Sequence, residues 1–177
     1  MSRMHSPKRP TPDQADFLRF WKDEAEQLDT SHILHWSVDS YYPRLAIWSA
    51  LEPEGALLIS MLSRIVPKIT VINNHLEDEN RSSWEIAERL QEKYGIDIIY
   101  ETLFHDQREA FVGQFDAVIY GGRRGNSRTP ALLPVLKWNE QLGILTVAPL
   151  ARWKKDAVMA KITQEDIPCG YPVIELT

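Results

Sequence analysis

The sequence predicts an α/β domain with a mainly parallel sheet and helices on both faces of that sheet. Short apolar segments alternate with amphipathic segments along the centre of the chain, and capping signatures open several of the amphipathic segments. Glycines stand at the ends of both kinds of segment. Strands separated by helices form βαβ units, whose crossovers are right-handed and whose strands run parallel.

The composition fits one folded domain. The chain has 177 residues, of which 44% are hydrophobic and 25% charged, so we expect a sizeable core and no global disorder. The net charge of −5 argues against general nucleic-acid binding. The N-terminal residues lack the apolar stretch of a secretory signal, and no apolar run has the length of a membrane span. We therefore expect a cytoplasmic protein that does not bind membranes.

The N-terminal part predicts an arm followed by two helices. Residues 1–10 are polar and contain prolines, so we expect a mobile arm there. We expect residues 11–177 to form a single domain, and the protein to form a homo-oligomer. Thr11, Pro12 and Gln14 provide an N-cap, a first-turn proline and a capping-box glutamine. The apolar residues that follow at helical spacing are Phe17, Leu18, Trp21, Ala25 and Leu28. A second, short helix is expected over residues 31–40.

The centre and the C-terminal part alternate strands with helices. Apolar runs predict strands over residues 44–50, 68–73, 97–100 and 117–120. Helices are expected over residues 54–65, 82–94 and 154–162. Ser82 and Glu85 form a capping box, and Gly95 should end the helix that they open. Two further apolar segments, 135–138 and 144–147, flank a turn-rich stretch and predict a hairpin or an edge excursion of the sheet.

Candidate ligand-binding segments follow from this arrangement, because ligands of open α/β sheets bind outside the carboxyl ends of the strands. The segments at those positions cover residues 49–55, 73–79 and 121–128. In the first segment, backbone N–H groups and the start of the next helix could hold an anion. Its candidate residues are Ser49, Ala50, Leu51 and Glu52. It matches neither G-x-x-x-x-G-K-[ST] nor G-x-G-x-x-G, and an ordinary strand-to-helix turn is the alternative interpretation.

The segment 121–128 carries the clearest chemistry. Its two glycines follow a buried strand and allow close approach to the backbone, and its three arginines supply forked donors suited to phosphate or sulfate oxygens. A solvated basic loop is the alternative interpretation. The candidate anion ligands here are Gly122, Arg123, Arg124, Ser127 and Arg128.

The segment 73–79 and the single cysteine complete the candidates. The amide of Asn74 could bind a base or a ribose, and His75 could titrate near neutrality. The acidic residues 77–79 could hold a metal through oxygen atoms, but such runs are usually solvated, so no metal site is expected. Cys169 alone can form no intramolecular disulfide, and it leaves no thiolate set for structural zinc or an iron–sulfur cluster.

A series of short motifs stands in a fixed order between residues 31 and 172. The motifs are Ile33–Val38, Trp48–Leu58, Tyr94-Gly95-Ile96, Tyr120–Arg124 with Ser127-Arg128-Thr129, Ala148–Trp153, Asp166-Ile167-Pro168 and Gly170-Tyr171-Pro172. Their order and spacing resemble those of the phosphoadenosine-phosphosulfate reductase family. This resemblance implies an adenine-nucleotide alpha-hydrolase-like fold and an adenylyl-sulfate-type nucleotide as the ligand. It also implies that the segments around Ser49 and Arg123 are the anion loops.

The sequence departs from the family pattern at several points. The Glu-Cys-Gly-type tail that carries the family's reactive cysteine is not found, and residues 104–115 lack the paired cysteines of iron–sulfur members. Asn73-Asn74-His75-Leu76 stands where the family has a Leu-Asp-Thr-Gly turn. The Ser-Gly-Gly-x-Asp-Ser loop of ATP-cleaving relatives is also missing. The resemblance therefore implies the fold and the anion loops more directly than the reductive chemistry.

Three functions follow as hypotheses. The first is a reductase of adenylyl sulfates in reductive sulfur metabolism, in which Cys169 or a thiol of a partner protein attacks the sulfate sulfur. The second is a non-catalytic nucleotide-binding or regulatory module. The third is a transferase or hydrolase that cleaves a phosphoanhydride, with Arg123, Arg124 and Arg128 as an electrostatic clamp and Mg²⁺ held largely by substrate phosphates.

Overall fold

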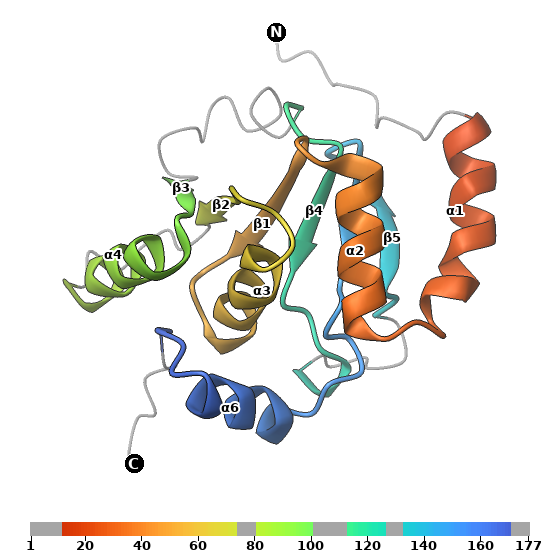
Figure 1. Ribbon diagram of the computed structural model, residues 1–177. Coiled ribbons are helices and arrows are strands. Elements are labelled where there is room, and N and C mark those ends of the chain that lie inside the picture. Colours follow the sequence, from red (N-terminus) through yellow and green to blue (C-terminus); the bar gives the residue numbers. More distant parts are fainter. Residues whose placement is uncertain (1–11, 74–80, 101–112, 127–132, 171–177) are drawn as a thin grey trace, which may run out of the picture.

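The computed structural model describes residues 12–73, 81–100, 113–126 and 133–170, so the expected N-terminal arm lies outside the described part. Its centre is a six-stranded sheet with the strand order β3-β2-β1-β4-β6-β5 (Figure 1). The strands are β1 Leu45–Ser49, β2 Thr70–Asn73, β3 Asp97–Tyr100, β4 Ala117–Tyr120, β5 Leu136–Asn139 and β6 Ile144–Val147. All neighbouring strands pair in parallel except β5 and β6, which form the expected hairpin. The prediction of a mainly parallel sheet is confirmed.

The described helices match those expected from the sequence to within a few residues. They are α1 Pro12–Ala25, α2 Thr30–Tyr41, α3 Pro53–Ser63, α4 Arg81–Tyr94 and α6 Lys155–Gln164, and the short 3₁₀ helix η2 covers Arg124–Asn126. The N-cap of α2 is Asp29, whose side chain accepts the N–H of His32 at 2.8 Å. Gly95 follows α4 with a φ of +64° and donates its N–H to Gln91 at 2.8 Å, which is the helix end that glycine favours.

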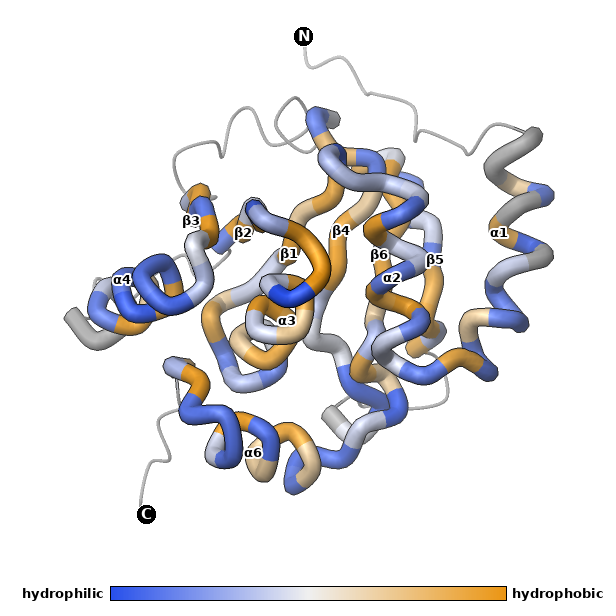
Figure 2. Tube along the Cα trace, viewed as in Figure 1, coloured by the Kyte–Doolittle hydropathy of each residue, from blue (hydrophilic) through white to orange (hydrophobic). Residues whose placement is uncertain are grey.

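The strands separate two faces of the sheet. On β1, Leu45 and Ile47 belong to the larger buried cluster, whereas Ala46 and Trp48 lie with the smaller one. Helices α1, α2, α3, α4 and α6 all contribute to the larger cluster, and Figure 2 shows apolar positions on the sides of α2 and α3 that meet the sheet. Within the described residues, no helix contributes to the smaller cluster. The described helices therefore cover one face of the sheet. Helices on the second face remain a prediction, because residues 101–112 between β3 and β4 lie outside the described part.

The sheet topology places the candidate segments along one edge. Ser49, the last residue of β1, pairs with Asn73 of β2, and Trp48 pairs with Tyr120 of β4. The turn from β1 to α3 and the loop after β4 are therefore neighbours, although about 70 residues separate them in the sequence. None of the described helices is long and apolar enough to span a membrane.

Candidate functional site

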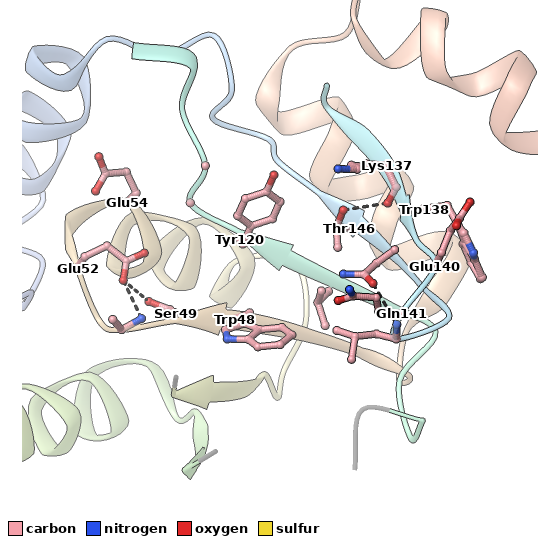
Figure 3. Close-up of a pocket in the computed structure, with 16 residues that line it drawn as sticks. Trp48, Ser49, Glu52, Glu54, Tyr120, Lys137, Trp138, Glu140, Gln141 and Thr146 are labelled. Atoms are coloured by element: carbon pink, nitrogen blue, oxygen red, sulfur yellow. Dashed lines mark hydrogen bonds between the residues drawn. The ribbon is translucent and has the colours of Figure 1, made fainter. Parts of the chain in front are cut away.

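A cavity of about 1070 Å³ lies over the face of the sheet that bears the smaller buried cluster, and it reaches the carboxyl ends of β1 and β4. Side chains from four strands line it, among them Trp48, Val118, Tyr120, Lys137 and Thr146. The register places these residues on the same face, because Trp48 pairs with Tyr120, Val118 with Thr146, and Thr146 with Lys137. Figure 3 shows Trp48, Tyr120 and Thr146 between the turn that bears Glu52 and the hairpin turn that bears Glu140. The cavity is large enough for a nucleotide.

Two aromatic side chains dominate the part of this cavity nearest the strand ends. Trp48 and Tyr120 lie on neighbouring strands, and both are partly exposed (Figure 3). The Tyr120 ring occupies the space where a Cβ at position 122 would stand, so Gly122 admits this ring. Burial raises the pKa of the Tyr120 phenol, which keeps the hydroxyl neutral and able to donate a hydrogen bond. The alternation of side chains along a strand predicts that both rings lie on one face of the sheet and that Ile47 and Ile119 lie on the other face.

The β1–α3 turn holds a carboxylate of its own. The Ser49 hydroxyl donates to Oε2 of Glu52 at 3.0 Å, and the Ala50 N–H donates to the same oxygen at 2.8 Å (Figure 3). Ser49 Oγ in turn accepts the Leu51 N–H at 2.8 Å. Leu51 is buried in the left-handed region at φ +61°, and its carbonyl accepts the Gly170 N–H at 2.8 Å. The candidate donors of Ser49 and Ala50 are therefore occupied by Glu52 in this structure.

Two glycines make the close packing around this turn possible. A Cβ at Gly55 would collide with Ser49 Oγ, which lies directly over the first turn of α3. A Cβ at Gly121 would stand 2.5 Å from Cβ of Glu54 and 3.2 Å from the backbone nitrogen of Gly55. The loop after β4 therefore packs directly on the start of α3, which places Gly121 and Gly122 beside the Ser49–Glu52 turn.

The first two arginines of the loop after β4 are bound to carboxylates. Nε of Arg123 donates to Oε1 of Glu54 at 2.6 Å, and both side chains are buried. Arg124 donates to Oε2 of Glu26 at 2.6 Å and to the Leu133 carbonyl at 3.0 Å. These bonds hold the loop to α3 on one side and to the segment after α1 on the other.

Glu26 is the centre of the second of these contacts. Its other oxygen, Oε1, accepts the Val135 N–H at 3.0 Å. Burial of the carboxyl group acts to raise its pKa, but the hydrogen bonds from Arg124 and Val135 and the charges of Arg124 and Arg152 outweigh it, so the pKa is lowered. Glu26 thus stays ionised and ties the loop after β4, which bears Arg123 and Arg124 and which we call the arginine loop, to the residue that precedes β5.

Several candidate residues lie outside the described part of the chain. These are Asn74, His75, the acidic residues 77–79, Ser127 and Arg128. Within the described part, no group of three or more His, Cys, Asp and Glu side chains could hold a metal ion. The buried Asn73, the last residue of β2, pairs with Ser49 at the carboxyl edge of the sheet.

Cys169 lies in the larger core cluster and is 8% exposed. Burial raises the pKa of its thiol, and the negative charge of Glu54 raises it further. A thiol in such surroundings is mainly protonated near neutral pH and is a poor nucleophile. The location is that of a packing residue.

Comparisons with known proteins give relatives of low but consistent similarity. No family model matches the chain. The adenosine 5'-phosphosulfate reductase of Salinibacter ruber is 23% identical over 173 residues, which cover 79% of this chain and 69% of the relative. The phosphoadenosine 5'-phosphosulfate reductase of Gloeobacter violaceus is 24% identical over 190 residues, which cover 88% of this chain and 77% of the relative.

A solved structure agrees with these sequence relatives. The phosphoadenylyl-sulfate (PAPS) reductase of Candida auris, in its phosphate complex, superposes with a TM-score of 0.69 at 19% identity. The match covers 91% of this chain and 90% of the other. The expected adenine-nucleotide alpha-hydrolase-like fold is confirmed.

Proposed function

Because the chain is a distant relative of the phosphoadenosine-phosphosulfate reductases, we propose that it binds an adenylyl-sulfate-type nucleotide at the carboxyl edge of the sheet. The observation that carries this proposal is the cavity whose aromatic wall, Trp48 and Tyr120, meets the two candidate loops. The adenine ring stacks on this wall, which contributes on the order of 1–3 kcal/mol. Polar groups of the hairpin turn, such as the side chain of Gln141, lie within the same cavity and can receive the base edge or the ribose.

The chemistry at the bound sulfate needs a thiolate that bonds to the sulfate sulfur while the nucleotide phosphate leaves. The core position of Cys169 and its raised pKa support a structural role for this cysteine. We therefore propose that a thiol of a second molecule supplies the nucleophile, and that this chain supplies the nucleotide site. In the absence of such a thiol donor the protein acts as a nucleotide-binding module.

Cleavage of a phosphoanhydride is the less favoured chemistry. Arg123 and Arg124 are each bound to a carboxylate, so an arginine clamp would depend on Arg128. In such a reaction, the substrate phosphates would supply most of the ligands of a Mg²⁺ ion.

Isothermal titration calorimetry with a panel of nucleotides tests the proposal. Adenosine 5'-phosphosulfate, its 3'-phosphorylated form and AMP are expected to bind, and GMP is expected to bind more weakly. Trp48→Ala should weaken adenylyl-sulfate affinity about tenfold, the factor that corresponds to losing one stacking contact. Trp84→Ala is the matched control, because Trp84 is 54% exposed on α4 and does not line the cavity.

Two outcomes of this experiment would contradict the proposal. The first is the absence of binding by every adenine nucleotide at millimolar concentration. The second is equal affinity of the folded Trp48→Ala variant and the unchanged protein. Incubation of the bound adenosine 5'-phosphosulfate with a dithiol or thioredoxin, followed by measurement of released sulfite and AMP, separates a reductase from a module that only binds.

A further inference from the structure

A second cavity, of about 530 Å³, lies on the other side of the arginine loop, where η2 meets the chain that enters α6. The Arg124 N–H donates to the Ala151 carbonyl at 2.9 Å, which fixes these two segments to each other. In Figure 1 this is the region beside the start of α6, at the carboxyl edge of β4 and β6. The cationic residues that line it are Arg123, Arg124, Arg152, Lys154 and Lys155, and we call it the basic groove.

The basic groove carries more positive charge than its carboxylate partners neutralise. Glu54 binds Arg123 and Glu26 binds Arg124, so five cations meet two carboxylates and three positive charges remain. Arg152 donates to the backbone carbonyls of Glu26 and Leu28. Its charge thus lies beside a carboxylate that already binds Arg124. Although the chain as a whole has a net charge of −5, this excess of three positive charges produces a local electrostatic potential that attracts anions.

The two lysines carry the part of this charge that has no carboxylate partner among the described residues. Lys154 and Lys155 are both exposed, and within the described residues neither makes an ion pair or a side-chain hydrogen bond. Lys154 is also the N-cap of α6, and its side chain cannot accept the N–H groups of the first turn. The start of α6 therefore adds a favourable dipole to the same groove.

Among the described residues, the β1–α3 turn is the other candidate anion position, and a carboxylate already fills it. In the β1–α3 turn the Glu52 carboxylate already accepts the Ser49 hydroxyl and the Ala50 N–H. An anion there would have to displace Glu52 and would also face Glu54. Negative charge is thus disfavoured at the turn and favoured in the basic groove.

We propose that the basic groove is a phosphate-binding site, and that it takes the anionic groups of a phosphorylated ligand in place of the β1–α3 turn. Arg152 and the two lysines supply the charge, while Arg123 and Arg124 form the fixed wall. This site goes beyond the proposed nucleotide cavity, because an inorganic phosphate can occupy it whether or not a base occupies that cavity.

Titration of the protein with inorganic pyrophosphate, followed by calorimetry at low and at physiological salt, tests this site. Binding is expected at low salt, and it should weaken as salt rises. Lys154→Ala and Lys155→Ala should each weaken pyrophosphate roughly fivefold, the factor for an exposed ion pair of about 1 kcal/mol. Lys161→Ala is the matched control, because Lys161 lies on the same helix outside the basic groove.

Glu52→Gln provides the contrasting variant. It removes the charge that closes the turn and keeps an oxygen acceptor for Ser49 and Ala50. The proposal predicts that pyrophosphate affinity in this variant changes less than twofold, which is about 0.4 kcal/mol. A large gain in Glu52→Gln, unchanged affinity in both lysine variants, or no binding to the unchanged protein would each overturn the proposal. Adenosine, which has no phosphate, tests the nucleotide cavity separately, so failure of one site is distinguishable from failure of the other.

Discussion

Replacement of Arg123 by alanine is expected to destabilise the fold strongly. Arg123 is 4% exposed and Glu54 is 8% exposed, and their side chains meet at 2.6 Å. The substitution leaves the Glu54 carboxylate buried without this guanidinium. Breaking a buried ion pair from one side costs about 3–5 kcal/mol. A domain of this kind is stable by about 5–15 kcal/mol, so roughly a fifth or more of its stability would be lost.

Urea denaturation followed by circular dichroism at neutral pH measures this loss. The double variant Arg123→Met with Glu54→Leu should recover most of it, because apolar residues of similar volume often replace a buried ion pair at little cost. Arg44→Ala is the control, since its pair with Asp116 is exposed and should contribute little. An Arg123→Ala variant within about 1 kcal/mol of the unchanged protein would refute the reasoning, because that value is typical of an exposed pair.

Three further predictions concern packing and titration. Gly121→Ala should lower the melting temperature, because its Cβ would stand 2.5 Å from Cβ of Glu54, whereas Gly125→Ala meets its nearest atom at 3.6 Å and should not. Cys169 should react with iodoacetamide slowly in the folded protein and rapidly in urea, and equal rates in the two states would contradict its burial. Because the pKa of this thiol is raised in the folded state, the free energy of unfolding should fall as the pH rises above the ordinary thiol pKa. Because the pKa of Glu26 is lowered in the folded state, its contribution to the free energy of unfolding is complete above the ordinary carboxyl pKa and is lost as the pH falls through the folded pKa. Glu26→Gln should remove this pH dependence from urea denaturation curves measured at a series of pH values, and an unchanged dependence would contradict the prediction.

The element order was predictable because it depends on local signals. The first-turn proline of α1 and the glycine after α4 mark helix ends through backbone geometry alone. The order of strands across the sheet was not predictable in this way. β6 lies between β4 and β5 because its parallel pairing with β4 and its antiparallel pairing with β5 both bury side chains, and these are long-range contacts.

The candidate site was predictable in its location and less so in its contacts. The strand-end rule placed Ser49 and Gly122 at the same edge, and the structure brings their loops together. Arg123 could not be assigned to its partner, since Glu54 lies 69 residues earlier in the sequence. The Glu52 carboxylate accepts the hydrogen bonds that an anion would otherwise accept in this turn. This depends on its side-chain conformation in the folded protein, which local sequence patterns do not determine.

We propose above all that an adenylyl nucleotide binds over the aromatic wall of the larger cavity. A titration of ¹⁵N-labelled protein with adenosine 5'-phosphosulfate, followed through the tryptophan indole N–H signals, tests it most directly. The account predicts that the Trp48 signal, assigned through a Trp48→Phe variant, shifts in a saturable manner while the Trp84 signal on α4 does not move. An unmoved Trp48 signal at saturating nucleotide would contradict the account.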